Sequence, residues 1–373
     1  MDRDSVIWLA RLNGDGTETG LRTEVPATSC PIVDPLTAPQ QITLTLEPES
    51  IDVGLFVPWQ TAVYVGTEDQ ILAAGIVDIN GVTSENSKLT VKCVGWSGYI
   101  AGMPWTDKAL SYVHTDPGKI LRAMWLQVQS HHAGNIGLSV PAVSTGTTVG
   151  TPAVYGKTKR GKKTVKTAAE PFVLASYATA DLAAAQTTLL TEGKIEYRER
   201  HWVEGGVVKH ALLMASPRLG RRNPDVRLVI GENVTEVPSV DPAQYASEVL
   251  VLGAGDGPKK IQSRQLIAAP PRLRRVYLHN QETITRSAAA ERLAKSLLKL
   301  LAGTADDVEK VVVTDGPSAR IGALVPGDEV LLSGDSGWAG PIEVWVRILE
   351  REWDEVAPQT VTLTVARADK VGE

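Results

Sequence analysis

The order of β-strand signals near the N-terminus is repeated near the C-terminus, and this repeat limits the fold more than any other feature. In each copy a Val-Pro pair opens a strand, a second strand follows, and a strictly alternating strand comes last, although few residues are identical. The copies comprise Leu55–Val63, Gly75–Ile79 and Lys88–Cys93, and then Ala323–Val330, Glu343–Leu349 and Gln359–Val365. Alternation of apolar and polar residues is typical of a strand with one buried face. The chain is therefore predicted to carry two similar antiparallel β-barrels.

Two equivalent barrels in one chain have a consequence for assembly. A closed ring needs a head-to-tail interface, and three copies of a duplicated subunit can present six similar positions around it. The alternative is that any two antiparallel β domains share this order of strands by chance.

The remaining patterns add two small α+β segments, so the predicted fold class is α+β, mainly β. The hairpin signal Asn80-Gly81 supports the first β domain, and Asp116-Pro117 reads as a helix cap followed by proline. The clearest helical pattern runs from Thr285 to Ala302. The domains are assigned to residues 1–105 (first β-barrel), 106–216 (α+β), 217–245 with 304–373 (second β-barrel) and 246–303 (small α+β).

The segment Ser144–Thr167 is low in apolar residues and rich in Gly, Thr and Lys, so it is predicted to be a long loop. Ten of its residues hold six cations and no acid, namely Lys157, Lys159, Arg160, Lys162, Lys163 and Lys166. Such a loop can contact an acidic neighbouring protein or passing DNA phosphate, or it can simply be solvated. All three interpretations stay open at this point.

The aromatic composition is unusual, with nine Trp and eight Tyr against two Phe. Trp and Tyr suit interfaces because each joins an apolar body to one polar group, although chance composition explains the numbers equally well. We single out Trp59, Trp96 and Trp105 as candidate interface residues. An alternative function is a carbohydrate-binding or receptor-binding module, in which these tryptophans or Trp338 would be exposed in a groove.

Composition and charge argue against several classes of protein. No apolar run approaches the ~18 residues of a membrane helix, and Val6–Ala10 is too short for a secretory signal, so the chain is expected to be made and kept without a signal of its own. The net charge of -5 argues against general affinity for nucleic acids. Cys30 and Cys93 are too few for a disulfide framework, and Cys93 is predicted to be a buried small hydrophobe.

No catalytic residue, cofactor site or metal site is predicted, and the chain is expected not to be an enzyme. Gly253–Gly257 lacks the third glycine and the following helix of a dinucleotide-binding motif, so it is predicted to be a turn. His131 and His132 are adjacent and would point about 100° apart on a helix, which prevents them from sharing a metal ion. Glu352 and Asp354 are interpreted as ordinary surface charges.

Several segments, taken in order, resemble minor tail proteins of siphophages that infect actinobacteria. They are Ala211–Arg222, Leu228–Val234, Ala246–Gly257, Arg272–Tyr277 and Leu324–Val330. Together they extend over most of the chain, and their order is more specific than any one of them. The resemblance implies a fold of the phage baseplate-hub type, with two tail-tube-like barrels and two inserted α+β domains, assembled as a homotrimer.

The resemblance also implies a role and a set of partners. Such a tail hub joins the six-fold tail tube, or its distal tail protein, to three-fold tail-tip and receptor-binding proteins. It surrounds the channel for the tape-measure protein and the genome, so DNA only passes through. The expected location is the tail tip of a virion assembled in the host bacterial cytoplasm. Longer family members carry extra C-terminal domains, some of which are lytic. This chain stops at Glu373, so a tip hydrolase is expected to be a weaker alternative.

Overall fold

The computed structural model describes residues 5–22, 24–67, 70–85, 87–157, 163–235, 239–240, 245–270, 273–282, 284, 287–301, 308–335, 341–357 and 360–368. The backbone of these residues is mainly β, with three α-helices, in agreement with the predicted class. The chain divides into two compact units. Unit 1 comprises Met1–Arg221, Ile321–Asp328 and Leu349–Val361, and unit 2 comprises Arg222–Arg320, Glu329–Ile348 and Thr362–Glu373.

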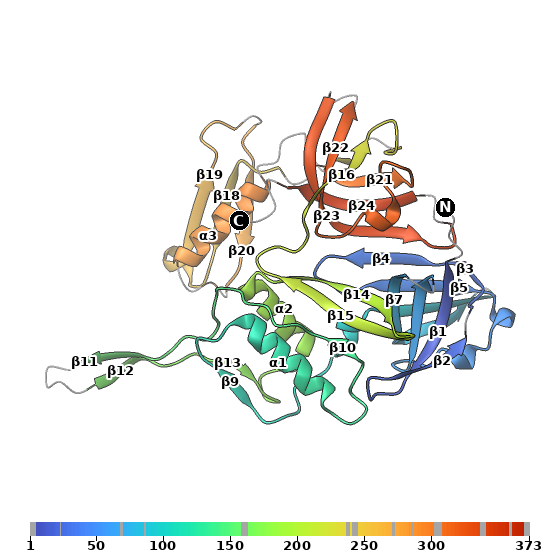
Figure 1. Cartoon of the computed structure of the whole chain (residues 1–373). Coiled ribbons are helices and arrows are strands. Elements are labelled where there is room, and N and C mark those ends of the chain that lie inside the picture. Colours follow the sequence, from blue (N-terminus) through green and yellow to red (C-terminus); the bar gives the residue numbers. More distant parts are fainter. Residues whose placement is uncertain are drawn as a thin grey trace. The chain divides into compact units, whose positions relative to one another are not determined.

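Unit 1 begins with the first β domain, whose strands follow the order β4-β5-β8-β7-β6-β1-β2, with β3 beside β5 (Figure 1). In β5 the predicted alternation is confirmed, because Ile42, Leu44 and Leu46 are buried and the residues between them are not. The last residues of β23 pair with β4 at one edge. The bounds are β1 (Val6–Leu12), β2 (Glu18–Arg22), β3 (Ala27–Ser29), β4 (Pro31–Pro35), β5 (Gln41–Leu46), β6 (Thr61–Gly66), β7 (Ile71–Glu85), β8 (Lys88–Val94) and β23 (Pro341–Asp354).

The second part of unit 1 is the α+β segment, in which two helices pack beside short sheets. Asp116 caps α1 by accepting a hydrogen bond from the Gly118 N–H at 2.8 Å, with Pro117 as the first helical residue, as predicted. Asp181 caps α2 by accepting a hydrogen bond from the Ala183 N–H at 3.0 Å. The elements are β9 (Leu110–Tyr112), α1 (Pro117–Gln129), β10 (Leu138–Ser139), β11 (Val154–Lys157), β12 (Lys163–Thr167), β13 (Phe172–Leu174), α2 (Leu182–Gly193), β14 (Glu196–Glu204) and β15 (Val207–Ala215).

One hydrophobic cluster joins these two parts of unit 1. Trp125 of α1 and Leu189 of α2 belong to the same buried cluster as Tyr64 of β6 and Trp96 of the 3-10 turn η3 (Trp96–Ile100). Burial of large aromatic side chains is the main stabilising contribution of such a cluster. The first β domain and the α+β segment therefore share a core.

Unit 2 holds a second set of β strands and a small α/β module. Its β strands follow the order β17-β21-β24-β23-β22-β16. In the module α3 covers a three-stranded sheet of order β19-β18-β20, with its own buried cluster around Val249, Val251 and Ala294. The elements are β16 (Arg222–Val229), β17 (Ser239–Val240), β18 (Glu248–Leu252), β19 (Gln262–Leu266), β20 (Val276–Asn280), α3 (Ser287–Leu301), β21 (Val308–Thr314), β22 (Glu329–Asp335) and β24 (Thr360–Arg367).

The repeat predicted from sequence appears as the same strand order in both units. The sequential strands β5 to β8 lie in the spatial order β5-β8-β7-β6, and β21 to β24 lie in the order β21-β24-β23-β22. In each set the last three strands pair with one another in sequence order, and the first strand pairs with the last of the three. This arrangement is a Greek key. Each copy of the repeat is thus one Greek key.

The Val-Pro segments of the two copies also agree in local structure, bond by bond. A 3-10 turn precedes each, at Val53–Leu55 (η2) and at Ile321–Ala323 (η6). In each copy the N–H of the residue before the valine donates a hydrogen bond to the carbonyl oxygen of the first residue of the turn. Phe56 donates to Val53 at 3.0 Å, and Leu324 donates to Ile321 at 3.1 Å. The residue after each proline is left-handed, with φ of 57° at Trp59 and 98° at Gly327. Chance similarity of order does not explain this agreement.

The strands do not form closed barrels among the described residues. Closure needs the first and last strands of a sheet to pair with each other. Here the pairings follow an open path that ends at β17 and β2. One pair, β16 with β22, is parallel, unlike the antiparallel pairing predicted.

Candidate interaction surfaces

The lysine-rich segment is partly a β-hairpin and not only the loop that was predicted. Strands β11 and β12 pair antiparallel, with Lys157 opposite Lys163, and the hairpin extends outward from unit 1 (Figure 1). The β-branched residues Val154 and Val165 and the threonines of β12 suit a strand, which the Gly- and Lys-rich composition obscured. We call residues 154–157 and 163–167 the arm. Lys166 lies in β12, while Lys159, Arg160 and Lys162 lie outside the described residues.

The arm carries exposed apolar side chains as well as cations. Val154 is 52% and Tyr155 is 59% exposed. Exposed aromatic and aliphatic side chains are features of a contact surface.

Two of the three candidate tryptophans are buried and cannot contact a partner. Trp96 is 0% exposed: its Nε1 donates to the Ile136 carbonyl at 3.0 Å and its ring stacks on His210 at 4.0 Å. Trp105 is 1% exposed and donates to the Lys108 carbonyl at 3.2 Å. Both fill the shared core of unit 1, a role that composition cannot distinguish from an interface. Trp59 is half-buried, and its ring makes an edge-to-face contact with Tyr99 at a centroid distance of 5.9 Å. Trp338 lies outside the described residues.

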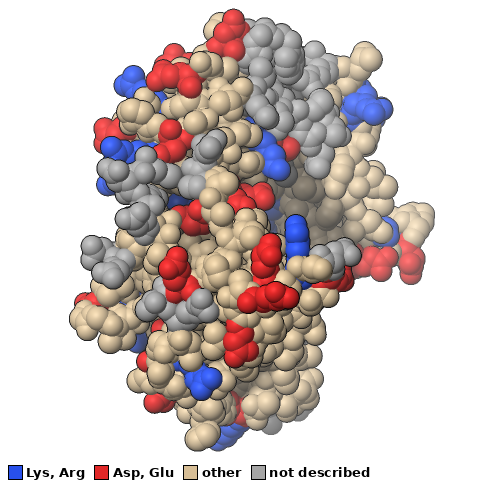
Figure 2. All heavy atoms as spheres, turned by 90° about the vertical axis from the view of Figure 1, so that its right-hand side faces the viewer, with Lys and Arg blue, Asp and Glu red and all other residues tan. Residues whose placement is uncertain are grey.

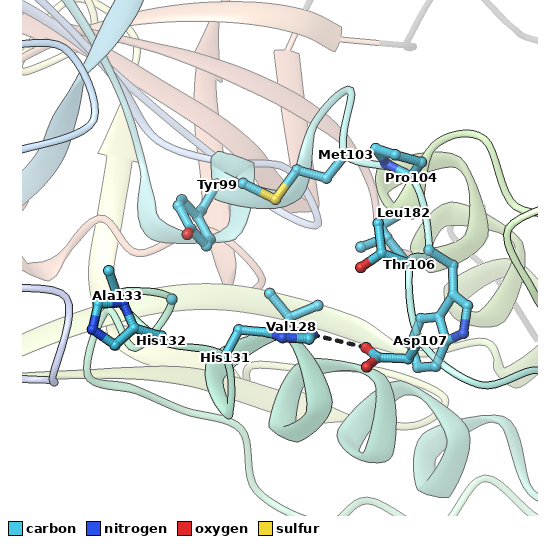
Figure 3. Close-up of a pocket in the computed structure, with 12 residues that line it drawn as sticks. Tyr99, Met103, Pro104, Thr106, Asp107, Val128, His131, His132, Ala133 and Leu182 are labelled. Carbon is cyan, nitrogen blue, oxygen red and sulfur yellow. Dashed lines mark hydrogen bonds and ion pairs between the residues drawn. The ribbon is translucent and has the colours of Figure 1, made fainter.

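A pocket of about 200 Å³ lies in unit 1 between η3 and the end of α1 (Figure 3). Tyr99, Met103 and Trp105 contribute to its walls. His131 turns toward Asp107, with 2.8 Å between Nε2 and Oδ2, while His132 lies on the other side of the pocket. The two histidines diverge, as expected for neighbours in sequence.

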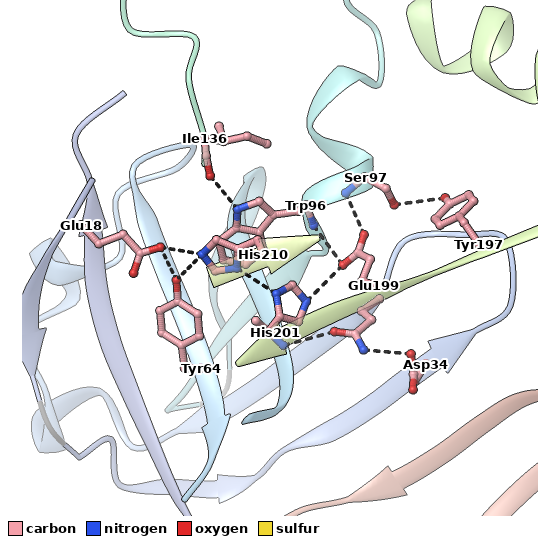
Figure 4. Close-up of polar contacts among 12 residues, drawn as sticks. Glu18, Asp34, Tyr64, Trp96, Ser97, Ile136, Tyr197, Glu199, His201 and His210 are labelled. Carbon is pink, nitrogen blue, oxygen red and sulfur yellow. Dashed lines mark hydrogen bonds and ion pairs between the residues drawn. The ribbon is translucent and has the colours of Figure 1, made fainter. Parts of the chain in front are cut away.

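A buried polar network connects the first β domain to the α+β segment within unit 1 (Figure 4). His210 of β15 lies 2.8 Å from Glu18 of β2 through Nε2, and its Nδ1 lies 2.8 Å from Nδ1 of His201 on β14. A hydrogen bond between two imidazole nitrogens requires one to carry hydrogen and the other to be bare. Glu199 completes the network by accepting from the Trp96 and Ser97 N–H groups at 3.1 and 2.7 Å.

Burial favours the neutral forms of His210 and Tyr64 within this network. Desolvation, which outweighs the hydrogen bond to Glu18, lowers the pKa of His210 from 6.5 to about 4. Desolvation also raises the pKa of Tyr64, whose hydroxyl contacts Glu18 and His210. His201 and His210 lie opposite each other because of the register of β14 against β15. Their spacing in the sequence does not show this pairing.

A second buried polar group ties β23 to β4, also within unit 1. Arg351 Nε donates to Asp34 at 2.8 Å, and Gln40 donates to the other oxygen of the same carboxylate at 2.8 Å. Asp354 accepts hydrogen bonds from the Ser29 hydroxyl at 2.6 Å and the Cys30 N–H at 2.9 Å. These bonds lower the pKa of Asp354 against the opposing effect of burial. Asp354 therefore holds strands together. The interpretation of Asp354 as an ordinary surface charge, made from the sequence, is wrong.

Other chemistry-like features behave as follows. Gly255 and Gly257 have φ of 109° and 52°, which confirms the predicted turn. Cys30 and Cys93 are buried and unpaired, and burial raises the pKa of both thiols. Within the described part of the chain, no group of three or more His, Cys, Asp or Glu side chains could hold a metal ion. No helix there is long and apolar enough to cross a membrane.

Solved structures with a similar fold include tail proteins of prophages. The chain is similar to the 43 kDa tail protein of prophage MuSo2 from Shewanella oneidensis, with a TM-score of 0.58, 13% identity, and coverage of 98% of this chain and 99% of that one. It is similar to the tail protein from Neisseria meningitidis MC58, with a TM-score of 0.53, 14% identity, and coverage of 98% and 97%. It is also similar to prophage tail protein gp18 from Listeria monocytogenes EGD-e, with a TM-score of 0.51, 13% identity, and coverage of 96% and 94%.

The chain has the fold of prophage tail proteins. The tail-protein fold extends over both units, because the matches include nearly the whole of each chain. No family model and no curated protein matches the sequence.

Within this tail-protein fold, one further surface is apolar and lies on the module of unit 2. In β20, which lies at the end of the three-stranded sheet, Val276, Tyr277 and Leu278 are exposed. An edge strand of this composition is a possible pairing site.

Proposed function

We propose that this chain is a tail-hub subunit that assembles as a homotrimeric ring at the tip of a bacteriophage tail. The observation that carries the proposal is the pair of Greek keys with matching Val-Pro turns, found in a chain with the tail-protein fold. Three copies of a subunit with two similar domains place six similar domains around one axis. Such a ring fits a six-fold tail tube on one side and three-fold tip proteins on the other.

The proposal extends to the partners and the location. The ring joins the tail tube or a distal tail protein to the downstream tail-tip and receptor-binding proteins. It surrounds the channel for the tape-measure protein and the genome, in a virion assembled in the host bacterial cytoplasm. The role is structural and not enzymatic. The likeness to siphophages of actinobacteria stays a prediction of the sequence.

The alternative of a carbohydrate-binding or receptor-binding module has lost its main support. It required the candidate tryptophans to be exposed in a groove, but Trp96 and Trp105 are in the core.

The experiment for the hub proposal is a mass measurement followed by imaging. Mass photometry of the purified chain is expected to give three times the chain mass of 40.0 kDa, alone or after addition of a distal tail protein. Averaged particle images should then show six similar densities around a channel. A stable monomer in both conditions would contradict the proposal.

The channel wall gives an independent check. A wall that passes a polyanion without holding it should be polar and net acidic, as the overall charge of -5 favours. A strongly basic lumen in the ring would contradict this part of the proposal.

A further inference from the structure

Four titratable side chains form one chain of contacts inside unit 1. They follow in the order Glu18, His210, His201 and Glu199, with a carboxylate at each end and two imidazoles between them (Figure 4). Figure 2 shows many acidic and basic side chains on the outer surface, where water solvates them. His210, His201 and Glu199 are instead only 3%, 7% and 6% exposed. The place of each proton in this chain therefore depends on the neighbouring groups.

The contacts of His210 determine which of its nitrogens carries hydrogen. Its Nε2 lies 2.8 Å from Oε1 of Glu18, and a carboxylate only accepts hydrogen bonds, so Nε2 donates. Desolvation has the largest effect on His210 and lowers its pKa to about 4, which favours the neutral ring. Neutral His210 then has a bare Nδ1, which lies 2.8 Å from Nδ1 of His201. His201 therefore carries hydrogen on Nδ1 and donates it to His210.

This arrangement leaves one nitrogen of the pair without a hydrogen bond. Nε2 of His201 is buried and has no hydrogen-bond partner among the described residues. It faces Oε2 of Glu199 at 3.6 Å, just beyond hydrogen-bond distance. Both oxygens of Glu199 act as acceptors, for the N–H groups of Trp96 at 3.1 Å and Ser97 at 2.7 Å. Two acceptors thus face each other, and a proton on Nε2 would turn their contact into an ion pair.

A pocket of about 200 Å³ lies beside this unpaired nitrogen, wholly within unit 1. Glu199 and His201 both line it. The other charged residues of its wall are Asp34, Arg198, Arg200 and Arg351. The pocket gives a proton from solvent a path to His201, whereas the ring of His210 is covered by Trp96, on which it stacks at 4.0 Å.

We propose that the His201–His210 pair is a two-step proton switch between the first β domain and the α+β segment. The first proton binds Nε2 of His201 and pairs with Glu199, and every hydrogen bond of the network is kept. The second proton binds Nδ1 of His210, where two N–H groups then face each other and two cations lie 5.1 Å apart. The rings must separate, so the hairpin of β14 and β15 moves away from β2 and η3 and admits water.

The other groups around the two rings favour this order of protonation. Lys209 is adjacent to His210 and disfavours a second cation there. The ring of Trp96 lies 5.1 Å from that of His201, and an aromatic face attracts one nearby cation. The Tyr64 hydroxyl, 3.3 Å from Nε2 of His210, is uncharged and opposes neither step. The switch belongs to unit 1 alone, so it goes beyond the proposed hub function and its test does not require a ring.

Nitrogen-15 NMR of the histidine rings in the wild-type chain measures the proton positions directly. At neutral pH, His210 is expected to carry hydrogen on Nε2 and not on Nδ1. As the pH falls, His201 should hold hydrogen on both nitrogens before Nδ1 of His210 becomes protonated. His201→Gln and His210→Gln assign the signals. Hydrogen on Nδ1 of His210 at neutral pH, or protonation of His210 before His201, overturns the proposal.

Removing the charge of Glu199 tests the first step by itself. Glu199→Gln keeps an oxygen acceptor but no longer offers an ion pair, so His201 should gain its second N–H at a lower pH than in the wild type. Glu204→Gln, at an exposed position of the same strand, is the matched control and should leave the titration unchanged. An unchanged titration in Glu199→Gln contradicts the first step. If this variant does not fold, the wild-type proton positions decide.

Hydrogen exchange at a series of pH values tests the second step. Between pH 6.5 and 4 the open form binds a proton on His210 that the closed form does not. After correction for the intrinsic exchange rate, opening of β2, β14 and β15 should therefore rise by up to about tenfold per pH unit as the pH falls. The module of β18, β19, β20 and α3 is the internal control. Unchanged protection of β14 and β15, or an equal rise in the module, overturns the proposal.

Discussion

Trp59 and Gly327 occupy the same position in the two Val-Pro turns, and both have left-handed backbone conformations. This conformation costs an L-residue roughly 1–2 kcal/mol, and glycine avoids the cost. The first copy therefore bears strain at Trp59 that the second does not. The ring of Trp59 packs on Tyr99, which offsets part of this strain. At the residue scale the two copies have diverged in side chain while the backbone stayed the same.

Replacing Gly327 should show how strongly this turn is determined. A Cβ at Gly327 would lie 2.9 Å from the Leu219 carbonyl oxygen, at a φ of 98°. We expect Gly327→Ala to lower the free energy of unfolding by roughly 2–3 kcal/mol, measured by urea denaturation. Gly102→Ala is the control, since Gly102 has a φ of 72° with open space around it and should lose only about 1 kcal/mol. Equal losses would show that the close approach is unimportant.

The buried His210 should make folding sensitive to acid. Its folded pKa of about 4 lies below the ordinary 6.5, so the unfolded chain binds a proton between these values and the folded chain does not. The contribution to stability is complete above pH 6.5 and is lost as pH falls toward 4, by at most about 3 kcal/mol.

Denaturation at a series of pH values tests this prediction. His210→Gln should flatten the fall in unfolding free energy between pH 6.5 and 4, whereas His131→Gln, at an exposed position, should leave it unchanged. The groups that face His210 are Glu18, Tyr64 and His201, with Lys209 adjacent in sequence, and all remain in both variants. An unchanged slope in His210→Gln would assign the acid sensitivity to other groups.

At the scale of elements, strand β23 is shared between the units. Its first residues pair with β22, and its last residues pair with β4. The Asp34–Arg351 pair at that end is buried, with side chains 5% and 10% exposed. An ion pair in this setting is costly to break because the remaining charge stays buried.

We therefore expect Arg351→Met to destabilise unit 1 by roughly 3–5 kcal/mol. Thermal or urea unfolding measures the effect. Lys295→Met is the comparison, since the pair of Lys295 with Glu291 on α3 is exposed to solvent and an exposed pair contributes little to stability. A loss of similar size in both variants would contradict the role given to the buried pair.

At the scale of the whole molecule, the chain passes between the two units several times. The module of β18, β19, β20 and α3 differs from the rest because one continuous stretch builds it and it has its own buried cluster. Such a module can open without the remainder of the molecule.

Hydrogen exchange should separate the module from the first β domain. Val249→Ala removes a fully buried side chain and should cost the module about 2 kcal/mol, with faster amide exchange in β18 and α3 and unchanged exchange in β5 to β8. Val91→Ala, also fully buried, should give the opposite pattern. Faster exchange throughout the molecule in both variants would show that the units unfold together.

Much of the architecture could be predicted from local pattern. The alternation in Gln41–Leu46 and the Asp116-Pro117 cap predicted a strand and a helix start that the structure contains, because side-chain period and capping are local properties. The repeated Val-Pro segments predicted two related β domains for the same reason.

Only the tertiary structure decided which residues meet. Trp96 and Trp105 read as interface residues in the sequence and lie in the core, since exposure depends on what folds over a side chain. The His201–His210 pair arises from the register of β14 against β15. The tertiary structure also decided whether the sheets close into barrels. Closure requires pairing between edge strands that are far apart in the sequence, which local patterns do not determine.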